Sequence, residues 1–434
     1  MSLSVTFILA RISEVFERHP AGVFRIHEAR PPLGLGYLAA LLEARGHSVT
    51  IIDQQLSLED DSATVRRVME SRPELVGFSC TTINFSRSVD LARSLRAELS
   101  DAFIVAGGIH PTLKPSETLA TRVFDAVIRG EGEVPILSLV EALEGKDGNP
   151  GAGCRGLVFA NQIEPVGSEM AVLDDLDMVW PSRKTLRVDE YENSGALIEG
   201  MPCHSMIQSR GCPWVCRFCA KPHYHKIYRV RNIQLVVDEM ASLVEDYGAR
   251  SICFREDNFT ADKMRLLELT AAIKERFGDS LPWECESRAD LDLSVLDQMV
   301  EAGCRGIWCG IETSQKRWQE FLGKALNVEK IRPFFNACEQ RGIATGALFM
   351  FGFPNQHLDD VARDVDFALS LPLKWRYFQL LGLLPGNTLY PTFIQDNHVE
   401  WLTPEAGLSV FPGMTASEMI EMERDINTLL NPKP

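Results

Sequence analysis

The 434-residue sequence contains no run of eighteen or more apolar residues, so we predict no membrane-spanning helix. Positive charge is scarce, because 44 lysines and arginines stand against 60 aspartates and glutamates, giving a net charge of −16. Proteins that bind nucleic acids are usually basic, so this balance argues against a phosphate-backbone partner. We therefore expect neither a membrane span nor a nucleic-acid partner.

The amino terminus also lacks the features of a signal peptide. MSLSVTFILARIS has no basic segment ahead of its apolar residues and no small-residue cleavage site, and is better explained as a first strand. Eleven cysteines in so long a chain do not form a disulfide framework, and most lie singly in apolar runs, as core thiols do. These features favour a reducing compartment, and we expect a cytoplasmic protein.

Residues 1–145 alternate short β-branched runs with amphipathic stretches. Runs such as VTFILA, SVTIID and FIVAGG are separated by segments such as LGYLAALLEARG, with apolar residues every three or four positions. This alternation predicts an α/β, Rossmann-like domain with a parallel sheet and right-handed crossovers. The loops after its strands should line one crevice, because ligands bind there in open parallel sheets.

The rest of the chain divides into three further segments. Residues 146–198 contain the turn-rich KDGNPGAGCRG and the hairpin-like GLVFANQIEPVG, so we predict a linker with a small hairpin. Residues 199–395 resume the alternation through six strand–helix units, which predicts a partial (β/α)6 barrel, since a complete eight-stranded barrel needs more chain. Residues 396–434 are predicted to form a short helical tail.

Three cysteines lie close together directly after the first strand of the second α/β segment. Cys212, Cys216 and Cys219 are four and then three positions apart in SRGCPWVCRFCAKP. Thiolates bind iron–sulfur clusters, and three of them hold a [4Fe–4S] cluster with one iron left open. The bulky residues among them would keep water from such a cluster.

The same loop is compatible with two less favoured hypotheses. The first is a zinc site whose fourth ligand is a nearby histidine, namely His204, His223 or His225. The spacing is unusual for zinc, so this is the weaker alternative. The second is three coincidental core cysteines, which the mixture of Cys, Arg and Lys without amphipathic periodicity makes weaker still.

The CxxxCxxC pattern after the first barrel strand resembles the signature of the radical S-adenosylmethionine (radical SAM) superfamily. The resemblance implies that the three cysteines ligate a [4Fe–4S] cluster, whose fourth iron the amino and carboxyl groups of SAM chelate. It also implies that one electron cleaves SAM to methionine and a 5′-deoxyadenosyl radical. An external one-electron reductant, such as a flavodoxin- or ferredoxin-like protein, is then expected.

Later motifs agree with this resemblance in order and spacing. REDNF (255–259), CESRAD (285–290), GIETS (310–314), LFMFGFP (348–354) and LLPGNTLY (383–390) are similar to the family's second- to sixth-strand segments. A carboxylate at the second would offset the charge of SAM, and an arginine at the third could pair with its carboxylate. Singly, each could be a helix cap or a turn. The implied SAM contacts are Phe218, Glu256, Asp257, Glu286, Arg288, Glu312, Ser314 and Phe351.

The amino-terminal segment resembles the cobalamin-binding domain fused to one class of radical SAM enzymes. The similar stretches are PPLGLGYLAALLEARGHSV (31–49), GGIHPTLKP (107–115) and RGEGE (129–133). Their glycines allow a large flat ligand to approach the backbone, and PPLGLG departs from the GxGxxG of dinucleotide-binding domains. The expected cobalamin contacts are Leu33, Gly34, Ser79, Thr81, Thr82, Gly107, Gly108, Ile109, His110, Gly130 and Glu131.

The DxHxxG motif, whose histidine binds cobalt in some cobalamin proteins, is absent. After the second strand the chain reads IIDQQLSLED. Cobalamin could therefore bind without a histidine ligand, or the domain could bind nothing. His110 is the only histidine in a predicted crevice loop, and we interpret it as a hydrogen-bonding residue rather than a cobalt ligand.

The resemblance as a whole implies a cobalamin-dependent radical SAM methyltransferase. One SAM would methylate cob(I)alamin, and another would give the radical that takes hydrogen from an unactivated carbon of a small-molecule or natural-product substrate. The substrate radical would then take the methyl group from methylcobalamin. The alternative keeps both cofactors but performs cyclisation, ring contraction or oxidation without methyl transfer.

Two further alternatives are weaker. A non-catalytic cobalamin or iron–sulfur sensor would not need the intact SAM motifs. A methylthiotransferase carries additional amino-terminal cysteines and a carboxyl-terminal RNA-binding domain, whereas the first 150 residues here hold only Cys80.

Overall fold

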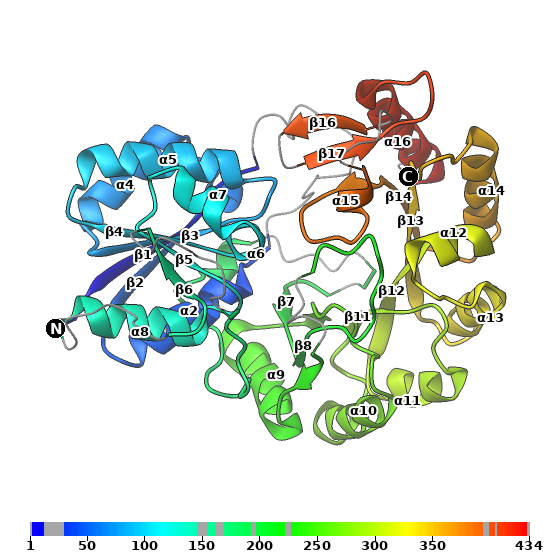
Figure 1. Ribbon diagram of the computed structural model, residues 1–434. Helices are drawn as coiled ribbons and strands as arrows, with labels where there is room; N and C mark the ends of the chain where they lie inside the picture. Colours follow the sequence, from blue (N-terminus) through cyan, green and yellow to red (C-terminus); the bar gives the residue numbers. More distant parts are fainter. Residues whose placement is uncertain are drawn as a thin grey trace. The chain divides into compact units, whose positions relative to one another are not determined.

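The computed structural model describes residues 2–12, 30–145, 154–160, 169–191, 197–198, 200–221, 227–393, 399–403 and 406–431. The chain folds as two compact units, Met1–Glu17 with Glu28–Tyr191 and Arg18–His27 with Glu192–Pro434. Each unit is built around its own parallel sheet (Figure 1). Among the described residues, no helix is both long enough and apolar enough to cross a membrane.

The first unit holds a six-stranded sheet in the order β2-β1-β3-β4-β5-β6. Its strands are β1 (Ser4–Leu9), β2 (Ser48–Asp53), β3 (Leu75–Ser79), β4 (Phe103–Gly107), β5 (Ala126–Ile128) and β6 (Leu157–Phe159). All neighbours pair in parallel except β6, which is antiparallel to β5. The strand order reverses between β1 and β3, and parallel sheets bind ligands at such a point. The predicted Rossmann-like domain is confirmed.

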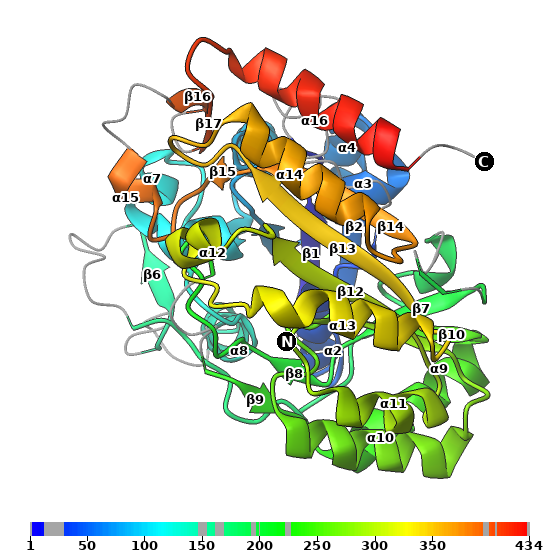
Figure 2. The same ribbon diagram turned by 90° about the vertical axis from the view of Figure 1, so that its right-hand side faces the viewer.

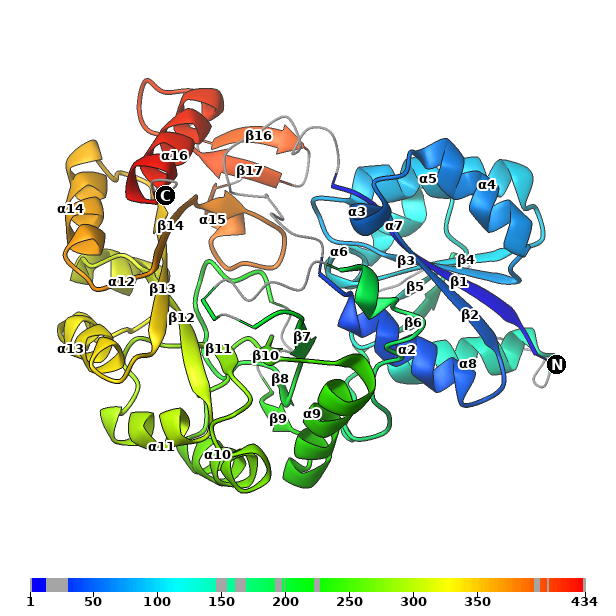
Figure 3. The same ribbon diagram turned by 180° about the vertical axis from the view of Figure 1, so that it is seen from behind.

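Helices cover both faces of this sheet, as strands with continuous apolar sequences require. Figures 1 and 3 show α4 (Asp61–Ser71) and α5 (Phe85–Glu98) on one face, with α2 (Leu33–Glu43) and α8 (Glu133–Leu143) on the other. Shorter helices follow the strand ends: α3 (Gln54–Ser57), α6 (Ile109–Leu113) and α7 (Pro115–Ala120).

The segment predicted as a linker with a hairpin is partly built into the first unit. Its strand β6 pairs with β5, with Ala126 opposite Phe159. Leu157 and Val158 are buried there and cover the edge of the main sheet. The remaining hairpin residues, 161–168, lie outside the described residues.

The second unit holds six parallel strands in sequential order, which confirms the partial (β/α)6 barrel. They are β7 (Cys203–Met206), β10 (Ser251–Phe254), β11 (Trp283–Ser287), β12 (Cys304–Glu312), β13 (Ala344–Phe351) and β14 (Trp375–Leu380). Figure 1 shows the helices as an arc outside these strands. They are α9 (Ile233–Tyr247), α10 (Lys263–Phe277), α11 (Leu296–Glu301), α13 (Val328–Glu339) and α14 (Leu358–Leu369).

Side chains on these strands alternate between two environments. In β12 and β13 one set is buried in the core beneath the helices: Ile307, Cys309, Ile311, Ala347, Phe349 and Phe351. The alternate residues are only partly buried, among them Trp308, Gly310, Leu348 and Met350. Because successive strand residues face opposite sides, this second set points to the inner side of the barrel.

The carboxyl-terminal segment confirms the predicted helical tail and adds a small sheet. The antiparallel strands β15 (Gly382–Leu383), β17 (Ala406–Ser409) and β16 (Val399–Thr403) are followed by α16 (Ala416–Leu430). Two shorter helices, α12 (Lys316–Leu322) and α15 (Tyr390–Phe393), flank the barrel strands. Figure 2 shows α16 alongside α14, near the last barrel strand.

Candidate active site

The cysteine loop, residues 211–221, follows strand β8 (Ser209–Arg210), which pairs antiparallel with β9 (Arg229–Val230). Cys212, Cys216 and Cys219 are all partly exposed, unlike most other cysteines of the chain. Burial raises the pKa of the Cys216 and Cys219 thiols. Burial disfavours the charged thiolate form. A metal ion that binds the sulfur in place of the proton offsets this cost, so the loop suits a ligand that binds thiolates.

Arg217, in the middle of this loop, fixes it to the barrel. Its backbone N–H donates to the Leu322 carbonyl at 2.8 Å, and its guanidinium donates to the Phe321 carbonyl at 3.0 Å. Its own carbonyl accepts from the Thr388 N–H at 2.9 Å. Gly323, at positive φ, leaves room for the arginine stem, because a Cβ there would lie 3.0 Å from Arg217 Cγ. The loop conformation is therefore set by the end of α12.

Glu256, after β10, is a carboxyl group buried beside the loop-bearing strand. It is 3 % exposed, its Oε1 accepts from the Gln208 N–H, and its Oε2 has no hydrogen-bond partner in the described structure. Burial, with the nearby charge of Glu286, raises its pKa to about 8. A cationic ligand beside it would stabilise the ionised form.

The other predicted carboxylates of this region differ in what they contact. Asp257 forms an ion pair with Lys221 of the cysteine loop, so it is a tether between the loop and β10. Glu286 lies on the partly buried side of β11, opposite the core residue Cys285. Asp257 is therefore engaged by the loop itself, whereas Glu256 retains a buried oxygen without a partner.

Arg288, for which pairing with the carboxylate of SAM is predicted, also has partners within the protein. Its Nε and Nη2 donate to the two carboxylate oxygens of Asp290 at 3.0 and 2.9 Å, and its Nη1 donates to the Lys324 carbonyl at 3.0 Å. Its guanidinium also lies 4.1 Å from the centroid of the Trp214 ring. The nearby Asp290 supplies the bidentate partner expected from the ligand.

Glu312, at the end of β12, forms a buried ion pair that the sequence does not reveal. Its Oε1 accepts from Lys324 Nζ at 2.5 Å, and the two residues are 6 and 8 % exposed. Glu312 has a φ of 65°, and a Cβ at Gly310 would lie 2.6 Å from both paired atoms. Lys324 Nζ also lies 5.9 Å from the ring centroid of Phe218. The pair therefore sits directly under the cysteine loop.

Ser314 anchors the turn that follows Glu312. Its N–H and hydroxyl both donate to Asp364 Oδ1 of α14, at 2.7 and 2.5 Å, and the Thr313 hydroxyl donates to Asp364 Oδ2 at 2.8 Å. With its hydroxyl hydrogen already donated, Ser314 serves to hold the GIETS turn in place.

Phe351, predicted as a SAM contact, lies on the helix side of β13. It is 1 % exposed within the helix-side core. Met350, the neighbour that points the other way, packs with Phe218 against the apolar cluster around Trp318 and Phe353. Strand alternation thus gives the inward apolar position to Met350.

In the first unit, the loops after β3 and β4 are locked together. Gly108 has a φ of 101°, and a Cβ there would lie 2.5 Å from the Cys80 carbonyl oxygen. That carbonyl accepts from the His110 N–H at 3.2 Å. Gly107 ends β4 and Ile109 begins α6, so the GGIH turn lies at the carboxyl ends of the strands.

His110 is buried and hydrogen-bonded within this turn. Its Nδ1 lies 3.2 Å from Thr82 Oγ1, and its ring stacks on Phe85 with 3.9 Å between centroids. Burial lowers its pKa to about 4, so it is neutral at physiological pH. Thr81 is held by Asn84, whose Oδ1 accepts from the Thr81 N–H at 2.7 Å, and Ser79 ends β3.

The remaining predicted crevice residues divide into two groups. Leu33 and Gly34 begin α2, and a Cβ at Gly34 would meet nothing within 4 Å, so this helix start is open. Gly130 and Glu131 instead hold the segment at 171–173: a Cβ at Gly130 would lie 2.2 Å from the Ala171 carbonyl oxygen, and the Glu131 carboxylate accepts from the Leu173 N–H at 2.5 Å. The cobalamin contact of Gly130 and Glu131 stays a prediction.

Comparisons with known proteins agree with these two sites. The family model described as B12 binding domain matches residues 23–140, and that of the Radical SAM superfamily matches residues 206–368. The chain thus combines a B12 binding domain with a radical SAM domain, as cobalamin-dependent radical SAM enzymes do. Its cofactors are a [4Fe–4S] cluster, SAM and cobalamin.

Curated relatives match most of the length of this chain. An uncharacterized methyltransferase of Pyrococcus horikoshii is 29 % identical over 85 % of this chain and 79 % of its own. The cytidylyl-2-hydroxyethylphosphonate methyltransferase of Streptomyces wedmorensis is 26 % identical over 91 % of this chain and 86 % of its own. The fold is that of the radical SAM methyltransferase TsrM from Kitasatospora setae, solved with cobalamin and a [4Fe–4S] cluster (TM-score 0.73, 21 % identity, 98 % of this chain and 81 % of that one).

Among the described residues, no group of three His, Cys, Asp or Glu side chains is close enough to hold one metal ion. His204, a possible zinc ligand, faces α9, where its Nε2 lies 3.2 Å from the Tyr247 carbonyl oxygen. His223 and His225 lie outside the described residues.

Two residues that hold the cysteine loop and its surroundings were not among the residues predicted from the sequence. Arg217 stands between two cluster cysteines in the motif itself, and its place there is the one signal that pointed to it. Lys324 follows a left-handed glycine at the end of α12, twelve residues after its partner Glu312. Nothing in that spacing indicates an ion pair, because the turn of the chain after α12 creates it.

Proposed function

We propose that this enzyme methylates an unactivated carbon of a small molecule, with the cluster and SAM held by the cysteine loop and the strand ends around it. The proposal rests chiefly on Glu256, whose buried oxygen without a partner suits the ammonium and sulfonium of SAM. When bound, the cluster and SAM supply a hydrogen-abstracting radical, and cobalamin supplies the methyl group.

The residues of the chain have distinct tasks in this proposal. Cys212, Cys216 and Cys219 hold the cluster, and Glu256 accepts hydrogen bonds from the SAM ammonium. Phe218 and Met350 present apolar surface on the inner side of the barrel, where adenine can pack. Arg288 holds Trp214 and the turn at Lys324 and so positions the loop without touching SAM.

The Glu312–Lys324 ion pair lies under the loop and adds no net charge there. Lys324 Nζ binds Oε1 of Glu312, which leaves the second carboxylate oxygen able to accept a hydrogen bond from a ribose hydroxyl. A one-electron donor of the flavodoxin or ferredoxin type is expected as partner. The small-molecule class of the substrate is supported by the named substrate of the Streptomyces wedmorensis relative.

Anaerobic reconstitution tests the proposal. The full chain, loaded with iron, sulfide and cobalamin, should convert SAM to 5′-deoxyadenosine once reduced, and with substrate should also form S-adenosylhomocysteine in equal amount. Replacing Cys212, Cys216 or Cys219 with Ala should abolish 5′-deoxyadenosine formation, because each loses a thiolate ligand of the cluster. Cobalamin binding, followed by its visible absorption, should be unchanged.

Cys154→Ala is the matched control, since Cys154 is also partly exposed but lies outside the loop. It should retain full SAM cleavage. Deoxyadenosine without S-adenosylhomocysteine in the presence of substrate would replace methyl transfer by the cyclisation or oxidation alternative. Zinc in the loop of anaerobically purified protein would contradict the proposal outright.

A further inference from the structure

A cavity of about 460 Å³ lies beside the outer edge of β2 in the first unit, and the proposed reaction makes no use of it. Its floor is made by Val49, Thr50 and Ile51 of this edge strand, in the body of the strand rather than at its carboxyl end. It is therefore separate from the crevice where the loops after β3 and β4 meet. A volume of this size is typical of small-molecule sites.

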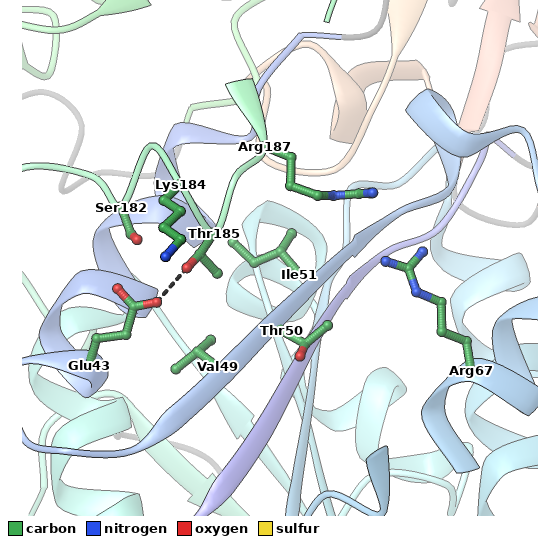
Figure 4. Close-up of a pocket in the computed structure, with 9 residues that line it drawn as sticks. All are labelled: Glu43, Val49, Thr50, Ile51, Arg67, Ser182, Lys184, Thr185 and Arg187. Atoms are coloured by element: carbon green, nitrogen blue, oxygen red, sulfur yellow. Dashed lines mark hydrogen bonds between the residues drawn. The ribbon is translucent and has the colours of Figure 1, made fainter. Parts of the chain in front are cut away.

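The cavity gathers positive charge in a strongly acidic chain. Arg67 of α4, and Lys184 and Arg187 of the segment after the first-unit sheet, line it, although the net charge of the chain is −16. The one acidic residue in the lining, Glu43, accepts a hydrogen bond from the Thr185 hydroxyl. Figure 4 shows the side chains of Arg67 and Arg187 extending toward one another across the edge of β2.

Both guanidinium groups keep donors for a ligand. The closest approach of Arg67 to a carboxylate is 3.6 Å, to Glu59, which is longer than a hydrogen bond. Arg187 contacts Glu190 at 3.0 Å through one nitrogen, Nη1, and a guanidinium has five N–H donors. Neither Glu59 nor Glu190 lines the cavity, so Glu43 is the one carboxylate in its lining against the three charges of Arg67, Lys184 and Arg187.

The wall that carries Lys184 and Arg187 is held firmly on α2. The Ser182 N–H donates to the Gly36 carbonyl at 2.9 Å, and a Cβ at Gly36 would lie 2.4 Å from Leu186 Cδ1, so only glycine allows this contact. Arg187 itself has a φ of 52°, in the left-handed region that few non-glycine residues adopt.

We propose that this cavity binds a small phosphorylated molecule, with the phosphate held between Arg67 and Arg187 and the organic part over Val49 and Ile51. Paired guanidiniums match the oxygens of a phosphate monoester bidentately and balance its double charge. The hydroxyls of Thr50 and Ser182 supply further polar partners. The site is independent of the reaction proposed above, because none of these residues belongs to it.

Calorimetric titration of the full reconstituted chain with AMP, and separately with inorganic phosphate, tests this site. AMP should bind saturably, and Arg67→Gln and Arg187→Gln should each weaken it about tenfold or more, the loss expected for a charge-assisted hydrogen bond. Arg66→Gln is the matched control, since it neutralises the exposed neighbour on the same helix, and should change the affinity less than about twofold.

A second measurement does not depend on the variants folding. In the wild-type chain, AMP should protect Arg67 and Arg187, but not Arg66, from modification by an arginine-specific dicarbonyl reagent. Absence of saturable binding at millimolar AMP and phosphate, or an equal loss in Arg66→Gln, would overturn the proposal. So would displacement of AMP by cobalamin, because the phosphate bound between the arginines would then be that of the cobalamin nucleotide tail.

Discussion

At the scale of single residues, Glu256 combines burial, a pKa raised to about 8 and an oxygen without a partner. A cation that binds there must displace a proton, so SAM affinity should rise as pH increases toward 8 and level off above it. Glu256→Gln should weaken SAM binding by roughly tenfold to a hundredfold and abolish this pH dependence.

The measurement is SAM affinity of the cluster-loaded protein between pH 6 and 9. Glu268→Gln, on the exposed side of α10, is the control and should behave as wild type. If Glu256→Gln keeps both the affinity and its pH dependence, Glu256 does not belong to the SAM site.

Lys324 is the second residue whose effect can be isolated. Lys324→Met leaves the Glu312 carboxylate buried without its cation, which should cost about 3–5 kcal/mol of folding stability in the second unit or force the carboxyl to become protonated. Lys324→Arg should retain most of the stability because it keeps the charge.

The double variant Glu312→Gln/Lys324→Met separates stability from function, since it removes both charges together. It should recover much of the denaturant midpoint lost by Lys324→Met, yet still bind SAM more weakly than wild type. Recovery of SAM binding along with stability would show that the pair is only structural.

At the scale of elements, α16 closes the open edge of the barrel sheet. The Asn427 side chain accepts from the Phe378 N–H and donates to the Phe378 carbonyl, both at 2.8 Å. Asn431 does the same for Arg376, at 3.0 and 2.6 Å, one helical turn further on. One turn before Asn427, Glu423 accepts from the Leu380 N–H at 3.4 Å. These side chains take the place of a further strand beside β14.

The carboxyl of Glu423 is buried, which raises its pKa to about 8 from an ordinary value near 4.5. The folded state therefore binds this proton more tightly than the unfolded state, and stability conferred by the neutral group is lost as pH rises toward 8. Glu423→Gln should remove this loss, and the stabilisation relative to wild type should reach roughly 1–4 kcal/mol above pH 8.

Hydrogen exchange of the Arg376, Phe378 and Leu380 amides as a function of pH checks this prediction. In wild type these amides should lose protection between about pH 5 and 8 beyond the intrinsic rise in exchange rate, and in Glu423→Gln they should not. Asn427→Ala should lower their protection at every pH. Equal pH profiles for wild type and Glu423→Gln would contradict the assignment.

At the scale of the whole molecule, the sequence determined a great deal. Strand–helix alternation indicated both parallel sheets, because hydrophobic periodicity is a local property of the chain. The three cysteines of the loop and the order of the motifs behind it resemble the radical SAM family, and the family model over residues 206–368 agrees. Thiolates are the side chains that hold iron–sulfur clusters, so this part of the motif can be read from sequence. The sequence also led to the interpretation of His110 as a hydrogen-bonding residue, and its Nδ1 lies 3.2 Å from Thr82 Oγ1. Its cobalamin contact stays a prediction.

Only the tertiary structure decided which side chains face the ligand sites. A register shift between Gly310 and Glu312 and the alternation of β13 give Met350, not Phe351, the inward position. Asp290 takes the guanidinium of Arg288, and Lys324 reaches Glu312 across a turn. Spacing in the sequence indicates which residues lie near the end of a strand. The direction in which each side chain points, and the residue with which it pairs, depend on packing between segments distant in the chain. A shift of one residue in strand register turns every side chain of the strand to the other face.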